Sequence, residues 1–267
     1  IITRLPPHWQ NQLREIRLRT GRPLIGVFAS GDHYLAPAGT PVNDPELAYR
    51  VSPEDAEAFL HAITRSSVYA LEREFRQGFL TLPGGHRVGL SGQALMEGES
   101  LRSLRHVGGF NVRIARQVRG AADLLLPRIV EPHGVAHTLV VSPPGCGKTT
   151  VLRDLARQLS AGPLPGLTGR PGLRVVLIDE RFELAAGRQG VPQLDVGPHT
   201  DVIDGCPKAV AIPLALRALG PQVIITDEIG GPEDAAVLAD VQRAGVSVIA
   251  SVHARDPHEA LERAGSE

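Results

Sequence analysis

The sequence contains few of the residues that mark secreted, disulfide-rich or zinc-binding proteins. Its 267 residues include two cysteines, Cys146 and Cys206, and neither has other Cys or His at zinc-ligand spacing. Two cysteines are too few for a disulfide framework, and so low a cysteine content is typical of proteins in a reducing compartment. No apolar run approaches the roughly 18 residues that a membrane helix needs, and we expect no signal or transit peptide at the N-terminus. The sequence therefore predicts a cytoplasmic protein without direct membrane insertion, peripheral at a membrane only through partner proteins.

A net charge of one sign is also missing, since 28 basic and 29 acidic residues leave a formal charge of -1. No global basic field favours nucleic acid, and aromatic residues, at 4%, offer few surfaces for base stacking. Lysine is scarce, because every basic residue except Lys148 and Lys208 is an arginine. A compact ammonium at Lys148 can act where a flat guanidinium cannot. Lys208 begins a predicted helix, against the dipole preference, so we expect it to contact an acidic partner.

The chain length predicts two domains, at roughly 100 to 200 residues each. Residues 1–120 contain both helical and strand patterns, which predicts a smaller α+β N-terminal domain. The patterns indicate a helix end and then a strand over 13–28, helices over 52–63 and 68–77, and two strands joined by a Pro-Gly-Gly turn over 78–95. A strand-like segment, 109–118, and a helix-like segment, 121–129, lead out of this domain.

Strands and helices alternate over residues 121–267, and the strands are apolar runs rich in β-branched residues. Such runs predict a mainly parallel sheet with helices on both faces, and therefore an α/β domain. The expected strands are 137–142, 174–180, 222–228 and 246–253, and the expected helices start at 148, 207, 232 and 257.

The stretch SPPGCGKTT, residues 142–150, lies between the first of these strands and the first helix. A Walker A loop needs glycines whose neighbouring N–H groups wrap phosphates, a lysine that reaches the outer two phosphates, and a Ser or Thr on magnesium. Gly147, Lys148 and Thr149 meet this pattern, although Ser142 replaces its first glycine. The candidate nucleotide-binding residues are Pro144, Gly145, Cys146, Gly147, Lys148, Thr149 and Thr150, with Thr149 also on Mg²⁺.

Acidic residues and a histidine stand at the ends of three further predicted strands. These are the pairs Asp179-Glu180 and Asp227-Glu228, and the single residue His253. Ligands of parallel α/β sheets bind outside the carboxyl ends of the strands, so we expect these side chains beside the phosphate loop. Asp227 is expected to hold the Mg²⁺ shell, Glu228 to orient or deprotonate the attacking water, and His253 to sense the γ-phosphate.

Two segments carry a resemblance to a known group of ATPases. The segment PQVIITDEIGGPEDAAVLADVQRAGVSVIASVHAR resembles the Walker B to His-box region of type II and type IV secretion ATPases, and IDERFE resembles their acidic box. With EIRLRTGRP, HRVGLSG through GFNVRIAR, and DVIDGCPKAVAIPLALRALGP, most of the chain is similar to the stage III sporulation protein AA family. Gly230 and Gly231 replace the Arg-Asp that secretion ATPases carry after the Walker B glutamate.

The resemblance implies a RecA-like P-loop ATPase domain, with ATP as the nucleotide and Mg²⁺ as the metal. It implies a homo-oligomeric, hexameric ring that energises assembly of, or transport through, a membrane-spanning sporulation or secretion complex. Asp179, Glu180 and Glu183 correspond to the acidic box and would join Glu228 and His253 in catalysis.

In ring ATPases an arginine from a neighbouring subunit or a mobile domain stabilises charge that develops on the γ-phosphate. Arg87, Arg113 and Arg116 of the first domain resemble such arginines by position, and Arg113 is our candidate.

Other functions stay open on the residues alone. They are a small-molecule kinase, a nucleic-acid-dependent RecA-like ATPase, and a nucleotide-gated scaffold with little turnover. The acidic pair at 227–228 favours water over a second substrate as the acceptor, which favours an ATPase over a kinase.

Overall fold

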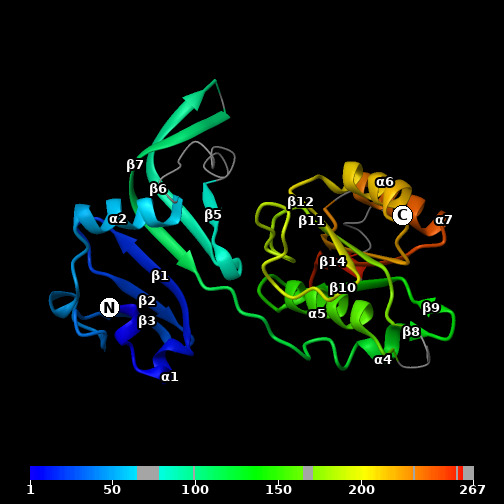
Figure 1. Ribbon diagram of the computed structural model, residues 1–267, viewed down its shortest axis with the longest axis horizontal. Coiled ribbons are helices and arrows are strands. Elements are labelled where there is room, and N and C mark those ends of the chain that lie inside the picture. Colours follow the sequence, from blue (N-terminus) through cyan, green and yellow to red (C-terminus); the bar gives the residue numbers. More distant parts are fainter. Residues whose placement is uncertain (65–77, 99, 165–170, 231, 257, 261–267) are drawn as a thin grey trace. The chain divides into compact units, whose positions relative to one another are not determined.

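The computed structural model describes residues 1–64, 78–98, 100–164, 171–230, 232–256 and 258–260 (Figure 1). The chain divides into two compact units, Ile1–Arg116 and Gln117–Glu267, whereas the sequence placed the boundary at residue 120. Each unit has its own sheet and its own hydrophobic core. No helix within the described ranges is long and apolar enough to cross a membrane.

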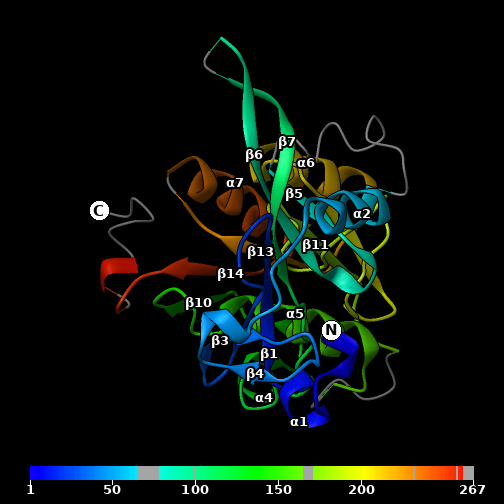
Figure 2. The same ribbon diagram turned by 90° about the vertical axis from the view of Figure 1, so that its left-hand side faces the viewer.

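Within the described residues, the first unit is built on a seven-stranded antiparallel sheet with the order β4-β3-β2-β1-β7-β6-β5. The strands are β1 (Leu13–Arg19), β2 (Ile25–Phe28), β3 (Gly31–Leu35), β4 (Pro41–Val42), β5 (Phe79–Thr81), β6 (Arg87–Glu97) and β7 (Ser100–Arg113). The hairpin of β6 and β7 extends past the ends of its neighbours (Figure 2). The predicted pair of strands joined by a Pro-Gly-Gly turn is confirmed as β5 and β6.

Helix α2 (Pro53–Thr64) packs on this sheet and begins with the capping box that the sequence predicted. The Ser52 hydroxyl accepts a hydrogen bond from the Asp55 N–H at 3.2 Å, and the Asp55 carboxylate accepts one from the Ser52 N–H at 2.9 Å. Phe59 of α2 meets Phe110 of β7 edge to face, with ring centroids 5.0 Å apart. The shorter helices of this unit are η1 (Ile2–Arg4), α1 (Pro7–Gln10), η2 (Pro45–Leu47) and η4 (Pro83–Gly85).

Three helices expected from the sequence were either wrong or lie wholly or mostly outside the described residues. The helix end expected at residue 13 was wrong, because β1 starts there and pairs with both β2 and β7. That second pairing joins residues almost a hundred positions apart, so no local pattern reveals it. The helix expected over 68–77 lies outside the described residues, as does most of the helix expected from 257.

The second unit contains a parallel sheet with the order β10-β14-β13-β11-β12 among the described residues. Its strands are β10 (Thr138–Ser142), β11 (Val175–Asp179), β12 (Thr200–Asp204), β13 (Val223–Glu228) and β14 (Ser247–His253). The main helices are α5 (Lys148–Ala161), α6 (Lys208–Ala218) and α7 (Pro232–Arg243). A short helix, α4 (Leu126–Ile129), and a small hairpin, β8 (Val130–Glu131) with β9 (Gly134–Val135), precede the sheet. The predicted α/β domain with a parallel sheet is confirmed.

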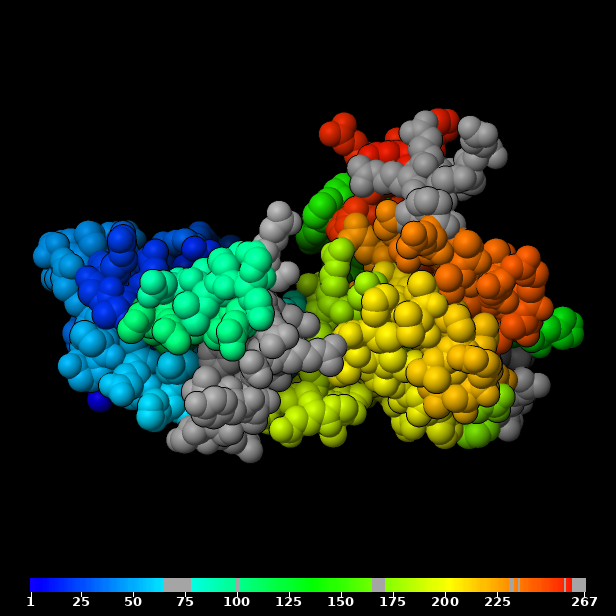
Figure 3. Space-filling view, turned by 90° about the horizontal axis from the view of Figure 1, so that it is seen from above, coloured from blue at the N-terminus to red at the C-terminus, as the bar shows by residue number. Residues whose placement is uncertain are grey.

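Helices cover both faces of this sheet, with α5 on one face and α6 and α7 on the other (Figure 1), and α6 and α7 lie side by side in yellow and orange in Figure 3. Alternate strand residues point to opposite faces. Leu177 and Ile225 pack with α5, whereas Ile178 and Ile224 pack with α6 and α7. All four are fully buried, and each contributes roughly 1.5 to 3 kcal/mol relative to an exposed position. This rigid sheet fixes the ends of its strands, where the predicted site residues lie.

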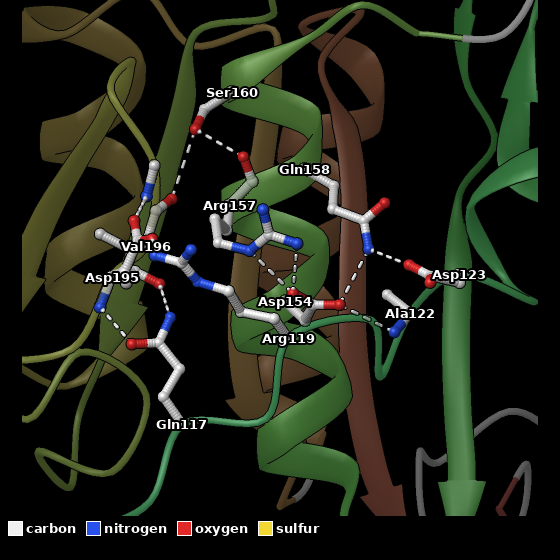
Figure 4. Close-up of polar contacts among 11 residues, drawn as sticks. Gln117, Arg119, Ala122, Asp123, Asp154, Arg157, Gln158, Ser160, Asp195 and Val196 are labelled. Carbon is white, nitrogen blue, oxygen red and sulfur yellow. Dashed lines mark hydrogen bonds and ion pairs between the residues drawn. The ribbon is translucent and has the colours of Figure 1, made fainter.

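The segment that opens the second unit is tied to α5 by polar contacts (Figure 4). The buried Asp154 carboxylate accepts hydrogen bonds from the Ala122 N–H at 3.0 Å, from Gln158 at 2.8 Å and from Arg157 at 2.9 Å. The helix expected over 121–129 forms only as α4, because Pro127 has no N–H to continue a helical ladder from the residues before it. The same segment reaches the loop before β12, where Arg119 pairs with the Asp195 carboxylate at 2.9 Å.

Candidate nucleotide-binding site

The phosphate loop joins β10 to α5 and needs glycine at two positions. Gly145 has a φ of 78° and Gly147, the N-cap of α5, has a φ of 88°. Both values lie in the left-handed region, which side chains other than glycine rarely adopt. The non-glycine residues with positive φ in the described ranges are His106, Phe182, Ala186 and Gln189. Ser142 is not among them, so the backbone conformation at this position does not require the glycine that Ser142 replaces.

Lys148 is the first residue of α5, and its side chain folds back over the phosphate loop. Its ammonium donates hydrogen bonds to the carbonyl oxygens of Ser142, at 2.6 Å, and Pro143, at 2.9 Å. It also lies 2.8 Å from Nδ1 of His253 at the end of β14. Since an ammonium can only donate, Nδ1 accepts, and the imidazole carries its proton on Nε2. The P-loop lysine and the His-box histidine are therefore in direct contact.

A pocket of about 250 Å³ opens at the carboxyl ends of β10, β13 and β14. Eight of the predicted site residues line it, namely Gly145, Gly147, Lys148, Thr149, Thr150, Asp227, Glu228 and His253. Arg181, Glu183 and Ser251 also line it. Pro144 and Cys146 lie in the same loop and are exposed. The structure thus brings together residues that are more than a hundred positions apart in the sequence.

Asp227 is buried at the end of β13; its Oδ1 lies 3.2 Å from the Lys208 ammonium, whereas no described residue donates a hydrogen bond to its Oδ2. Burial raises the pKa of Asp227 to about 6, the charge of Lys208 opposes this rise, and Asp179 and Glu180 add to it. A buried carboxylate with one oxygen that accepts no hydrogen bond suits a hard divalent cation such as Mg²⁺, which prefers oxygen ligands. Asp227 and the Thr149 hydroxyl in the same pocket therefore fit the expected metal.

Lys208, the other lysine, is the first residue of α6 and is also buried. Its ammonium lies 2.6 Å from Glu180, 3.2 Å from Asp227 and 3.9 Å from Asp234. Burial by itself would lower the pKa of Lys208, but the hydrogen bond to Glu180 and the neighbouring acidic charges outweigh it and raise the pKa. The acidic contacts that the sequence predicted are therefore made within this chain.

Glu228 follows Asp227 and reaches the pocket. One of its oxygens, Oε2, lies 3.0 Å from NH1 of Arg181 and 3.5 Å from Nε2 of His253. The side chain is 27% exposed, so water can reach it. A carboxylate in this position can orient or deprotonate a water molecule.

Asp179, the first residue of the acidic box, turns away from the pocket. It is fully buried, and its carboxylate accepts hydrogen bonds from the N–H groups of Glu183, Leu184 and Ala185 at 2.7, 3.1 and 2.8 Å. Burial raises the pKa of Asp179 against the opposing effect of these hydrogen bonds. Asp179 does not line the pocket, so it holds a loop rather than a substrate. Glu180 is likewise engaged with Lys208, and Glu183 is the acidic-box residue that reaches the pocket.

The three arginines singled out in the first unit make contacts there. Arg113, at the end of β7, has its Nε 3.6 Å from Glu15 and is largely exposed. Arg116 donates a hydrogen bond to the Leu13 carbonyl at 2.9 Å, and the Arg87 guanidinium lies 4.2 Å from the centre of the Phe79 ring. All the residues that line the pocket belong to the second unit. A catalytic role for Arg113 remains a hypothesis.

Sequence reasoning missed Arg181 altogether and did not place Lys208 in the site. Arg181 directly follows the Asp179-Glu180 pair, which is a signal that could have suggested it. Lys208 could have been suggested by the rarity of lysine, because both lysines of this chain serve the same site.

Comparison with known proteins identifies the family. The family model described as "Sporulation stage III, protein AA" matches residues 4–267. The chain belongs to this family. Stage III sporulation protein AA of Bacillus subtilis is 39% identical over 252 residues, which cover 94% of this chain and 76% of that protein. Protein SEEDLING PLASTID DEVELOPMENT 1 of Arabidopsis thaliana is 25% identical over 255 residues, 91% of this chain and 30% of that protein.

Solved structures share the fold. The ATPase DotB of Legionella pneumophila matches with a TM-score of 0.55 and 15% identity, over 97% of this chain and 67% of that chain. The pilus retraction motor PilT, solved with bound ADP, matches with a TM-score of 0.58 and 16% identity, over 96% of this chain and 68% of that chain. The predicted family and the predicted RecA-like fold are both confirmed.

Proposed function

We propose that this chain is a Mg²⁺-dependent ATPase. The observation that carries the proposal is a single pocket that contains the phosphate-loop residues Lys148 and Thr149, a buried Asp227, and a solvent-accessible Glu228. The fold shared with DotB and PilT, whose names describe an ATPase and a motor, supports it.

The residues divide the work of ATP hydrolysis between binding and activation. The N–H groups of the phosphate loop and the ammonium of Lys148 hold the phosphates. Mg²⁺ at Thr149 and Asp227 would neutralise charge on the β- and γ-phosphates. Glu228 holds the attacking water and takes its proton, as the water oxygen bonds to the γ-phosphorus and the bond to the ADP oxygen breaks. His253 bridges Lys148 and Glu228, so it can respond to the γ-phosphate.

We further propose that the protein works as a homo-oligomeric, hexameric ring in the cytoplasm, beside a membrane through partner proteins. In this role it would energise assembly of, or transport through, a sporulation-type membrane complex. Membership of the sporulation family supports the setting, and the likeness to a pilus retraction motor supports the motor role. Arg113 of one subunit would complete the site of another.

The test is ATP turnover at several protein concentrations, with the mass in solution measured in parallel. The variants are Glu228→Gln and, as a matched control, Glu233→Gln, which changes an exposed glutamate in the first turn of α7. We expect turnover to rise with assembly, to vanish in Glu228→Gln and to persist in Glu233→Gln. Nucleotide binding without hydrolysis at every concentration of the wild type would instead indicate a nucleotide-gated scaffold.

A further inference from the structure

Arg181 stands in the pocket at the turn after β11. Its guanidinium lines the same cavity as Lys148 and Thr149, and its NH1 is 3.0 Å from Oε2 of Glu228. The side chain is 64% exposed, so a ligand in the pocket can reach it.

The turn that carries Arg181 is held rigidly on its far side. Phe182, the next residue, has a φ of 57°, which is unfavourable for a residue with a side chain. Such a conformation persists only where the surroundings enforce it. Asp179 binds the three N–H groups that follow Phe182, and the buried Arg153 donates to the carbonyl oxygens of Leu184 and Glu183 at 2.5 and 2.7 Å. The base of Arg181 is thus fixed beside the pocket.

A chain of contacts links two cations across the pocket. The contacts run from Lys148 to His253 at 2.8 Å, from His253 to Glu228 at 3.5 Å, and from Glu228 to Arg181 at 3.0 Å. Two cations therefore flank one carboxylate. A γ-phosphate that Lys148 reaches would add negative charge between those cations. A guanidinium is permanently charged and forms strong paired hydrogen bonds with phosphate oxygens.

We propose that Arg181 contacts the γ-phosphate of ATP from within the same chain. When ATP binds, the Arg181 guanidinium leaves its ion pair with Glu228 and bonds to the γ-phosphate. The Glu228 carboxylate is then available to bind the attacking water. The site would then contain one arginine from the same chain, in addition to any arginine that a neighbouring subunit supplies. This inference rests on the proposed ATPase function, because it names a further residue of that site.

The test compares two nucleotides and needs no hydrolysis. Dissociation constants for Mg²⁺-ADP and for the non-hydrolysable analogue Mg²⁺-AMP-PNP are measured by titration calorimetry for the wild type and Arg181→Ala. We expect Arg181→Ala to weaken AMP-PNP binding about tenfold and ADP binding less than about twofold, since only the analogue has the third phosphate. Equal weakening of both nucleotides, or full retention of AMP-PNP affinity, would overturn the proposal.

Three controls complete the design. Arg217→Ala removes an arginine from the last turn of α6, where it bonds to the Pro213 carbonyl, and should change neither constant. Arg181→Lys keeps the charge and should recover part of the AMP-PNP affinity. Thermal unfolding of each variant reports whether it is folded. ATP turnover should fall in Arg181→Ala, and a rise would show that Arg181 only restrains Glu228, which contradicts the proposal.

These outcomes separate the inference from the ATPase proposal. A wild type that binds both nucleotides without turnover contradicts hydrolysis, whereas the loss of AMP-PNP affinity in Arg181→Ala still supports the contact. A wild type that hydrolyses ATP, with a variant of unchanged AMP-PNP affinity, contradicts the contact alone. A wild type that binds neither nucleotide overturns both.

Discussion

The ammonium of Lys208 lies 3.2 Å from Oδ1 of Asp227, and both side chains are buried. This ammonium also serves Glu180 and Asp234, so one cation faces three carboxylates. The imbalance leaves negative charge at the place where a divalent cation is expected. Lys208 thus stabilises the Asp227 carboxylate, but its single positive charge does not neutralise the three carboxylates around it.

Lys208→Met should therefore destabilise the second unit. Removing one member of a buried ion pair leaves uncompensated charge and typically costs about 3 to 5 kcal/mol. We expect a loss of about 3 kcal/mol in the free energy of unfolding, measured by urea denaturation at pH 7.5 without Mg²⁺. Arg217→Met, which alters an exposed arginine of the same helix, should change it little. If Lys208→Met and Arg217→Met lower the free energy of unfolding equally, Lys208 is not an essential countercharge.

Asp227→Asn should have the opposite effect. The pKa of Asp227 is raised to about 6 by burial, so the folded state binds its proton more tightly than the unfolded chain does. Ionised Asp227 therefore lowers stability above pH 6, and the penalty fades as pH falls towards 4. Removing the charge should stabilise the metal-free protein by at most about 3 kcal/mol at pH 7.5, with little gain at pH 4.

Urea unfolding at the two pH values checks this prediction. Asp240→Asn is the control, because Asp240 is largely exposed on α7 and pairs with Arg243. A stability gain that is equal at pH 4 and pH 7.5 would contradict a charge effect at Asp227. ATP turnover should be lost in Asp227→Asn, so stability and function are in conflict at this position.

Much of the second unit could be predicted because its signals are local. Apolar runs gave β10, β11, β13 and β14, and the loop SPPGCGKTT lies between a strand and a helix as expected. β12 was not predicted, because Thr200 to Asp204 is an edge strand with two aspartates and lacks a continuous apolar run.

Side-chain contacts in the site could be predicted less well. The strand-end rule placed Asp227, Glu228 and His253 together, but it could not show that Asp179 turns away to hold a loop. Nor could it place Lys208 between Glu180 and Asp227, because that depends on how α6 packs on the sheet. Such contacts are set by tertiary packing and leave no periodic pattern in the sequence.

Asp154→Asn should loosen the segment that opens the second unit from α5. Burial by itself would raise the pKa of Asp154, but hydrogen bonds from Ala122, Gln158 and Arg157 outweigh it, and the pKa is lowered. Its charge therefore contributes stability above the unfolded pKa of about 3.9, and this contribution is lost as pH falls below that value. We expect a cost of about 2 to 3 kcal/mol at pH 7 and a smaller one at pH 3, measured by urea unfolding. A cost that does not depend on pH would indicate lost packing rather than lost charge.

Gly172→Ala should destabilise the protein more than the matched substitution Gly245→Ala. Gly172 has a φ of 114°, and an added Cβ would lie 2.1 Å from the Ser160 carbonyl oxygen at the end of α5, a backbone atom that cannot rotate away. Gly245 also has positive φ, 72°, but a Cβ there meets nothing within 4 Å. Left-handed backbone costs a residue with a side chain about 1 to 2 kcal/mol at either position, and the steric clash adds to this only at Gly172. We expect Gly245→Ala to lose about 1 kcal/mol in urea unfolding and Gly172→Ala to lose at least about 2 kcal/mol more. Equal losses would mean that the chain at Gly172 can move away from α5, and that the helix carrying Lys148 is less firmly fixed than the buried contacts indicate.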